Sequence, residues 1–458
     1  MWRSAALGGL LVWAQLGCAV DRRPPFAAPE YGEAIHRLQT GPGPRVGAGP
    51  FQAGWAKVEI EVPAGTPLAG YGERDGAPHQ GVRDPIYARA LAIGAGRARV
   101  VLLASDLLLL DEQTTSEIRE ALAPLVPHEA LLFTASHTHS GPGAYAEGLI
   151  WELVFGAYAE ESRRAVVRAH VAAVEGALLQ QGPAKIGVSE IEGPDALIAN
   201  RVERGGPVDG VLYVLSVERQ DGRRAAWWSY GCHPVTLPAS NLLLSADYPG
   251  QIAAQFEGRR LEFLAFSAGG VGSSNPAREQ DDTGWLIEPL GRLLERGLER
   301  AQAVAKSEGR VAFLSRRVPL PTVNYRIGEG FGLFGPLVQA LTRLPKTLAL
   351  RAVAIDQAVI LQLPAELSGN LSRGARASAR RAGLKLAITP FNGSYVGYVV
   401  PRRVYDLPEA ERAELHGYET QVMTFFGPYG GDLMINYGLR LAARTAAAAR
   451  TPAPSDGE

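Results

Sequence analysis

Short apolar runs alternate along the chain with longer segments in which apolar residues recur at helical spacing. Runs of the first kind, typical of buried strands, cover residues 99–104, 130–136, 225–230 and 358–363. Segments of the second kind, typical of helices, cover residues 112–123, 157–181, 286–305 and 433–449, and another helix is expected from Glu366 onward. Because strands that alternate with helices usually build a sheet covered by helices, the pattern predicts an α/β fold with mixed β-sheets and flanking helices in a single large domain.

The first 20 residues have the composition of a signal segment. Arg3 precedes an apolar stretch over residues 5–14 that is too short to span a bilayer. The stretch leads to Leu16-Gly17-Cys18, which resembles the processing site of a bacterial lipoprotein, although Gln15 stands where that motif prefers Leu. Lipidation of Cys18 and ordinary signal cleavage nearby are both consistent with this segment. Either one predicts an exported protein, periplasmic or membrane-anchored on the cell envelope.

Composition divides the remainder of the chain into three parts. Residues 21–53 carry repeated Pro and Gly and are expected to form a linker, residues 54–449 the folded domain, and residues 450–458 a polar tail. The chain has 46 basic and 47 acidic residues, so no net field attracts nucleic acid, which is excluded as a partner. No protein partner is indicated. No disulfide can form within the chain once Cys18 is removed or acylated, because Cys232 is the only other cysteine.

Three of the eight histidines follow predicted strands. His137 and His139 close the apolar run 130–136, and His233 closes the run 225–230 and precedes Pro234. Residues two apart on a strand point to the same side, so we expect both imidazoles of the pair to enter one pocket. Such histidines are either metal ligands or hydrogen-bonded core or surface residues. The other five, which lie in polar or helix-face contexts, are expected at the surface: His36, His79, His128, His170 and His416.

Several short blocks, taken in order along residues 55–434, resemble the neutral, non-lysosomal ceramidase family. The most characteristic is Ala135-Ser136-His137-Thr138-His139-Ser140-Gly141-Pro142-Gly143. The others lie at residues 69–72, 84–91, 200–201, 232–234, 363–366, 392–398 and 418–419. The resemblance implies a hydrolase of linear amides that acts on a ceramide-like lipid and releases a fatty acid and an amine.

The resemblance also implies a catalytic zinc ion and the residues around it. Its ligands would be His137, His233, Glu366 and Tyr398, although Tyr395 could replace Tyr398. Two imidazoles, one carboxylate and one phenol leave room for a water molecule, as a catalytic zinc site requires. Without the resemblance, Glu366 is equally explained as a carboxylate at a helix N-terminus.

Three further residues of this chain match family residues that act on the substrate. His139 and Arg201 would supply a proton shuttle or hydrogen-bond donors to the oxyanion, and Tyr418 would donate a hydrogen bond to the same oxygen. The family also carries a serine in a Gly-Asp-Val-Ser-Pro-Asn block. Here the Asp is absent, and either Gly272 or Ser273 stands at the serine position, so Ser273 is a further candidate.

Two apolar segments favour a lipid substrate and membrane association. Residues 149–155 follow the histidine motif, and residues 331–338 lie in a Gly-rich setting that indicates a mobile loop. Apolar walls beside a polar reaction centre suit an acyl chain, although buried helix packing explains the first segment equally well. The altered Ser273 block leaves two alternatives to ceramide hydrolysis: a zinc hydrolase of a different ester or amide, and a catalytically silent relative that binds lipid.

Overall fold

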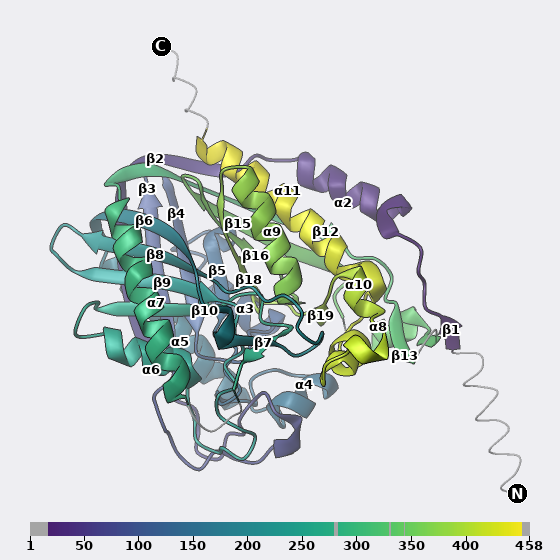
Figure 1. Cartoon of the computed structure of the whole chain (residues 1–458). Coiled ribbons are helices and arrows are strands. Elements are labelled where there is room, and N and C mark those ends of the chain that lie inside the picture. The colour runs from purple at the N-terminus through teal and green to yellow at the C-terminus, as the bar shows by residue number, and fades with distance from the viewer. Residues whose placement is uncertain (1–16, 279–282, 329–330, 343, 451–458) are drawn as a thin grey trace, which may run out of the picture.

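The computed structural model describes residues 17–278, 283–328, 331–342 and 344–450. Within these residues, one large mixed sheet forms the centre of the molecule and helices pack against it (Figure 1). Its strands are β2 (Arg45–Glu59), β3 (Tyr87–Ala95), β4 (Ala98–Ser105), β5 (Leu131–Ala135), β6 (Gly182–Glu192), β8 (Val211–Arg219), β9 (Arg224–Tyr230), β10 (Phe263–Ala268), β12 (Glu308–Pro319), β15 (Thr347–Ile355), β16 (Ala358–Gln362) and β18 (Lys385–Thr389).

Strand β2 joins the parts of this sheet. Its first residues pair with β12, and residues 51–59 pair with β3, which continues through β4 to β5. The path β10-β9-β8-β6 also meets β2, at Ala53. The edge strands β10 and β5 of this sheet lie close to one another. The Ser267 hydroxyl of β10 donates a hydrogen bond to the Thr134 hydroxyl of β5 (2.6 Å). The ends of β5 and β9, each followed by a histidine, are thereby brought together.

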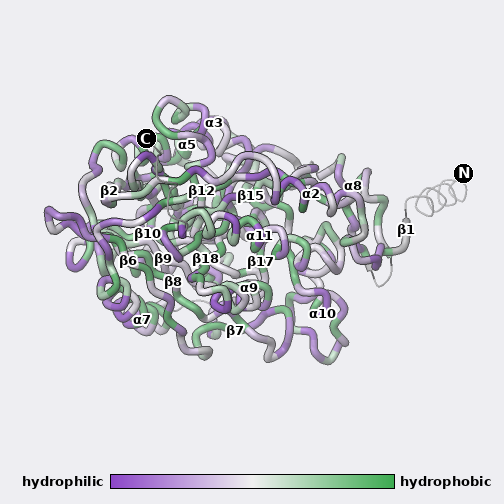
Figure 2. The backbone as a smooth tube through the Cα atoms, turned by 90° about the horizontal axis from the view of Figure 1, so that it is seen from above, coloured by the Kyte–Doolittle hydropathy of each residue, from purple (hydrophilic) through white to green (hydrophobic). Residues whose placement is uncertain are grey.

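Helices cover this sheet through apolar faces. The long helices are α2 (Pro29–Gln39), α3 (Glu112–Leu122), α5 (Glu160–Leu179), α6 (Asp247–Phe256), α7 (Gly284–Ala303), α9 (Gly369–Arg381) and α11 (Gly430–Arg450). Helix α5 packs on β2 and β3, α7 on β6 and β8, α9 on β18, and α11 on β15 and β12. Apolar segments gather in the central strands (Figure 2). Among the described residues, no helix has the length and apolar character needed to cross a membrane.

The predicted fold class, a mixed α/β architecture with flanking helices, is confirmed. The expectation of a linker over residues 21–53 is wrong for its structure, because this segment holds α2 and the first half of β2. Ala34 and Leu38 of α2 are buried in the core under α11, and Gly47 is required in β2 since a Cβ there would lie 2.0 Å from the Ala95 carbonyl oxygen. Gly47 therefore marks close strand contact rather than an extended arm.

Short elements surround the large sheet. They are β7 (Ile198–Asn200) with β11 (Ser274–Pro276), β17 (Glu366–Leu367) with β19 (Tyr398–Val399), β1 (Gly17–Ala19) with β14 (Phe331–Leu333) and β13 (Tyr325–Gly328), α4 (Leu149–Phe155), α8 (Gly335–Thr342), α10 (Arg402–Tyr405) and the single-turn segments η1 (Pro25–Ala27), η2 (Gly72–Arg74), η3 (His128–Ala130), η4 (Asp195–Leu197), η5 (Glu409–Glu411), η6 (Tyr418–Val422) and η7 (Gly427–Tyr429). The run 331–338, expected to be a mobile loop, forms β14 and the start of α8 instead. The β1-β14-β13 sheet and α8 lie at the edge of the molecule (Figure 1).

Candidate metal centre and active site

The two histidines of the His-Thr-His motif lie just beyond strand β5 rather than on it. The strand ends at Ala135, and His137 has a left-handed backbone with φ of +67°. This conformation is uncommon for a residue with a Cβ and is found at functional sites more often than elsewhere. The turn still places the rings of His137 and His139 on one side, with centroids 5.0 Å apart. The prediction that both histidines lie on the strand is therefore wrong, although their rings do lie on the same side.

The histidine that follows β9 joins this pair. The ring centroid of His233 lies 4.8 Å from that of His137 and 5.6 Å from that of His139. A backbone hydrogen bond from His139 N–H to the Pro234 carbonyl (3.3 Å) ties the two loops together. The ring nitrogens of the three histidines lie within 4.8 Å of one another, so this group could hold a metal ion.

A small parallel ladder supplies the carboxylate. Glu366 of β17 pairs in register with Tyr398 of β19, so Glu366 lies on a strand and α9 begins only at Gly369. The helix N-terminus interpretation of Glu366 is thus wrong. Its Oε1 atom lies 3.3 Å from Nε2 of His137 and 3.1 Å from Nε2 of His233. All three side chains are almost completely buried.

Backbone carbonyls fix which imidazole nitrogens face this carboxylate. Nδ1–H of His137 donates to the Leu108 carbonyl (2.7 Å), and Nδ1–H of His233 donates to the Val271 carbonyl (2.8 Å). In the neutral tautomer, each Nε2 then carries a lone pair, and neither Nε2 nor Glu366 Oε1 has a hydrogen-bond partner among the described residues. Three acceptor atoms directed at one buried point, with oriented imidazoles, fit a bound cation.

The electrostatics of the cluster agree with neutral His139 and His233 rings beside an ionised carboxylate. Burial lowers the pKa of His233 to about 3 and lowers that of His139 well below its usual value. Burial would by itself raise the pKa of the Glu366 carboxyl, but its contacts with His137 and His233 outweigh burial and hold that pKa well below its usual range. The ring of Phe391 stacks on His137 with centroids 3.9 Å apart and holds it in place.

His139 differs from the other two histidines in its contacts. Neither of its ring nitrogens has a hydrogen-bond partner within the described part of the chain. Tyr71 packs edge-on against its ring (4.8 Å between centroids), and a Cβ on Gly70 would lie 2.7 Å from its Cγ. Close packing rather than hydrogen bonding therefore positions this imidazole, which leaves both nitrogens free for a ligand or a proton.

Arg201 follows β7 and spans the other side of the cluster. Its guanidinium donates to Tyr398 Oη (3.0 Å), to the Asn275 side chain (3.1 Å) and to Glu419 Oε1 (2.5 Å). One of its terminal nitrogens also lies 3.8 Å from Glu366 Oε1. Burial would lower the pKa of Arg201, but the neighbouring Glu419, Tyr398 and Glu366 outweigh it and raise that pKa. The side chain is therefore a fixed cation.

Three tyrosines lie around the carboxylate. The Tyr395 hydroxyl donates to Glu366 Oε2 (2.8 Å), so this phenol orients the carboxylate, whereas the Tyr398 hydroxyl accepts from Arg201. Burial raises the pKa of both phenols well above the usual value. Tyr418 packs edge-on against Tyr398 (5.6 Å between centroids), is 40% exposed, and has its pKa raised to about 12 by burial. It is the most accessible of the three.

Ser273 is held in backbone hydrogen bonds beside the cluster. Its hydroxyl accepts from the Gly369 N–H (3.0 Å), and its carbonyl accepts from the Arg201 N–H (2.9 Å). At Gly272, a Cβ would lie 2.8 Å from the Glu366 carbonyl oxygen. The glycine thus permits the close approach of this loop to β17, and a serine at that position would require the backbone to move.

Several residues in the site escaped prediction from the sequence. Glu419 and Asn275 bind Arg201, Phe391 stacks on His137, and Tyr71 packs on His139. Glu419 and Tyr71 belonged to blocks that drew attention, at residues 418–419 and 69–72, but neither was assigned a role. The surface expectation was wrong for His170 and His416, which are buried, whereas His36 and His128 are exposed and His79 is half-buried.

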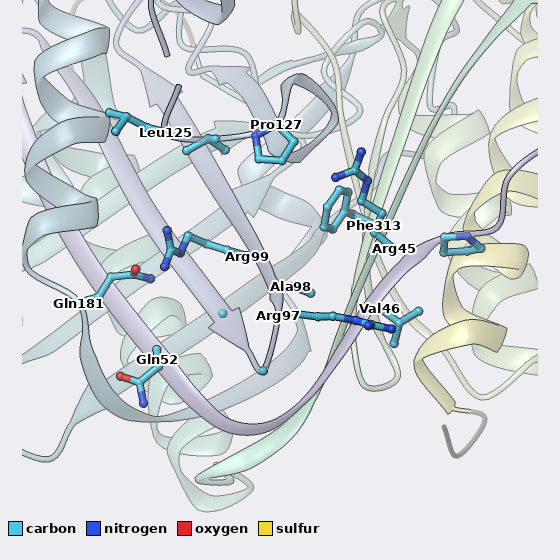
Figure 3. Close-up of a pocket in the computed structure, with 14 residues that line it drawn as sticks. Arg45, Val46, Gln52, Arg97, Ala98, Arg99, Leu125, Pro127, Gln181 and Phe313 are labelled. Atoms are coloured by element: carbon cyan, nitrogen blue, oxygen red, sulfur yellow. The ribbon is translucent and has the colours of Figure 1, made fainter. Parts of the chain in front are cut away.

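The first apolar segment lies beside the site. Trp151 of α4 packs edge-on against Tyr395 (5.8 Å between centroids), and Leu153 is 70% exposed. In contrast, a cavity of 930 Å³ that opens near the turn between β3 and β4 contains none of the cluster residues. It is lined by arginine, glutamine and apolar side chains, among them Arg99, Gln181 and Leu125 (Figure 3).

Comparisons with known proteins agree on one family. Residues 51–267 match the family model of neutral/alkaline non-lysosomal ceramidase, N-terminal. The neutral ceramidase of Mycobacterium tuberculosis (strain ATCC 25618 / H37Rv) is 25% identical over 209 residues, which are 42% of this chain and 33% of that protein. The chain therefore matches about a third of the length of this curated relative.

Solved structures agree with this result at the level of the fold. The crystal structure of neutral ceramidase from Pseudomonas aeruginosa matches with a TM-score of 0.71 and 20% identity over 89% of this chain and 76% of that chain. A structure described as ceramidase complexed with C2 matches with a TM-score of 0.70 and 19% identity over 89% of this chain and 77% of that chain. At this identity the likeness establishes a shared fold.

Proposed function

We propose that this chain, whose residues 51–267 match the neutral/alkaline non-lysosomal ceramidase family, hydrolyses the N-acyl amide bond of a ceramide-like lipid with the help of zinc. The observation that carries the proposal is the convergence of His137 Nε2 and His233 Nε2 on Glu366 Oε1, at 3.3 and 3.1 Å, where none of the three atoms has a hydrogen-bond partner among the described residues. Such an arrangement of nitrogen and oxygen donors is typical of catalytic zinc sites.

The proposed ligands are His137, His233 and Glu366, with Tyr398 as the fourth. Tyr398 stands opposite Glu366 in the β17–β19 ladder, whereas the Tyr395 hydroxyl already donates to Glu366. When bound, zinc supplies a Lewis acid that polarises the amide carbonyl and lowers the pKa of water.

The remaining site residues are proposed to accept a proton during hydrolysis or to contact the substrate. His139 is neutral, because burial lowers its pKa, and can accept a proton at a free ring nitrogen. Arg201 carries a permanent charge at the site and stabilises negative charge that develops on the carbonyl oxygen. Tyr418 is exposed at the rim and keeps its proton, since its pKa is raised to about 12, so it can donate a hydrogen bond to the substrate.

The substrate is proposed to approach along apolar side chains. Leu153 of α4 is exposed, and Trp151 of the same helix packs on Tyr395. An acyl chain on this surface would help position the carbonyl at the histidines. We further propose that the protein is exported and acts on the cell envelope, where lipidated Cys18 or apolar loops bring it to the membrane.

One observation favours a second candidate, a zinc hydrolase of a different ester or amide. The Ser273 hydroxyl accepts a hydrogen bond from the Gly369 N–H, so it is engaged in supporting α9. If hydrolysis of a substrate requires a free serine hydroxyl, this chain would cleave that substrate less well than relatives that carry the family serine.

Fatty acid release from a long-chain ceramide by the zinc-loaded protein tests the proposal. We expect release from the wild type, a loss on the order of 100-fold or more in His139→Ala and Arg201→Ala, and a modest decrease in Ser273→Ala. Short water-soluble amides should be poorer substrates. If the zinc-loaded protein cleaves soluble esters but leaves every long-chain amide intact, the second candidate replaces the first.

A further inference from the structure

A buried acidic side chain binds Arg201. Glu419 lies in η6, directly after the exposed Tyr418, and its side chain is completely buried. Oε1 accepts the Arg201 Nε–H at 2.5 Å, and Oε2 has no hydrogen-bond partner among the described residues. Burial raises the pKa of this carboxyl to about 8 although Arg201 opposes the shift, so its ionised form depends on the neighbouring guanidinium.

The guanidinium therefore contacts two carboxylates. Its Nε–H binds Glu419, and its Nη2 atom donates to Tyr398 Oη (3.0 Å) and lies 3.8 Å from Glu366 Oε1. The Gly272 carbonyl also accepts from Nε (3.2 Å), which fixes the plane of the fork. Since the fork is rigid, a contact at Nε determines where the terminal nitrogens point.

Charge balance follows from the same geometry. Arg201 faces the carboxylate that is the proposed ligand of a divalent cation, so its own positive charge opposes binding of that cation. Glu419 neutralises this charge when it is ionised. Without it, the guanidinium would turn more fully toward Glu366 and compete with the metal.

We propose that Glu419 is a positioning residue that acts only through Arg201, orienting its guanidinium and cancelling its charge so that Glu366 stays available to the metal. This inference rests on the proposed function for the role of Arg201 in catalysis. The part that concerns metal binding can be tested without any substrate.

Zinc affinity measured by chelator competition at about pH 9, where the Glu419 carboxyl is ionised, provides that test. Glu419→Gln keeps an oxygen acceptor for the Arg201 Nε–H but removes the charge, and we expect its zinc dissociation constant to rise about 10-fold or more. Glu419→Asp keeps the charge and should stay within about threefold of the wild type. Arg201→Gln should bind zinc at least as tightly as the wild type. The double variant Arg201→Gln/Glu419→Gln should return to within about threefold of the wild type, because the charge that needed compensation is gone.

The control is Glu414→Gln, which removes the same charge from an exposed position five residues away in sequence and should leave zinc affinity unchanged. The proposal is overturned if Glu419→Gln binds zinc as the wild type does, or if the double variant is as weak as Glu419→Gln alone. A simple packing role would give one of these two results, since the isosteric amide preserves packing.

A second readout uses the same variants on ceramide. If Glu419 acts through Arg201, the loss of kcat in the double variant should be no larger than in Arg201→Gln alone. Multiplicative losses would contradict the proposal. Should the wild type not hydrolyse ceramide, the proposed function fails while the zinc measurements still decide the role of Glu419.

Discussion

At the residue scale, two backbone carbonyls determine how His137 and His233 can bind a cation. Each carbonyl takes the Nδ1 proton and leaves Nε2 directed at Glu366. His139 has no such partner, although its ring centroid lies only 5.0 and 5.6 Å from those of the other two histidines. The three histidines are therefore not equivalent, despite forming one cluster.

We expect this difference to appear in the metal content. The wild-type protein should hold about one zinc per chain, and His137→Ala or His233→Ala should lose it while keeping most of the fold. His139→Ala should retain zinc, since its ring is not oriented as a ligand. Elemental analysis after gel filtration, with circular dichroism as the folding control, measures both. Full zinc retention in the first two variants would contradict the assignment of His137 and His233 as zinc ligands. Zinc loss in His139→Ala would show that His139 is a ligand as well.

Resemblance to the family blocks could identify some of these residues and not others. The His-Thr-His and His-Pro histidines, Glu366, Arg201 and Tyr398 come from distant parts of the chain, and the structure brings them together. No spacing could reveal the left-handed backbone of His137 or the stacking of Phe391 on its ring. The same holds for Glu419, because a buried glutamate is recognisable only once its cationic partner is known.

At the scale of elements, the periodicity of apolar residues predicted strands of the large sheet and the long helices that pack on it. The segment 112–123 forms α3 (Glu112–Leu122), and the segment 286–305 forms α7 (Gly284–Ala303). Prediction failed where glycine and proline occur inside regular structure, as in β2. It also could not find the two-residue strands β17 and β19, because their pairing depends on residues more than 30 positions apart.

A contact between α5 and β4 makes the stability of the fold depend on pH. His170 of α5 donates its Nδ1–H to the Val166 carbonyl (2.7 Å) and accepts at Nε2 from the Ser105 hydroxyl of β4 (2.5 Å). Both hydrogen bonds suit the neutral ring, and burial lowers the pKa of His170 to about 4. The unfolded chain binds this proton near pH 6.5, so the contribution to stability is complete above that pH and is lost as the pH falls toward 4.

We therefore expect His170→Gln to change the pH dependence of unfolding. Between pH 7 and pH 4.5, the metal-free wild type should lose about 2.5 kcal/mol more unfolding free energy than the variant does, from a shift of this size. Urea denaturation at the two pH values measures it. His128→Gln, at an exposed position, should behave as the wild type. Equal losses in His170→Gln and the wild type would mean that His170 is not the group that titrates.

At the scale of the whole molecule, the N-terminal region and the candidate site share an apolar periphery. The backbone of Cys18 in β1 pairs with Gly332 of β14, beside Phe331, which is 69% exposed. Strand β13 of the same small sheet packs on η6, the segment that carries Tyr418 and Glu419, and the Tyr325 hydroxyl donates to the Val422 carbonyl (3.1 Å). A lipid on Cys18 would thus hold the side of the molecule that continues to the rim of the site.

Export and lipidation of Cys18 remain predictions of the sequence, and this arrangement makes them testable. When the full chain is produced in a bacterium fed labelled palmitate, we expect the label on the wild type and its partition into the detergent phase. Cys18→Ala should carry no label, and Cys232→Ala, which alters a buried cysteine, should be labelled as the wild type is. The label is the decisive measurement, since an uncleaved signal segment could also hold Cys18→Ala in detergent. An unlabelled wild type that stays in the aqueous phase would mean ordinary signal cleavage and would leave the apolar side chains around Phe331 as the route by which the protein meets a lipid surface.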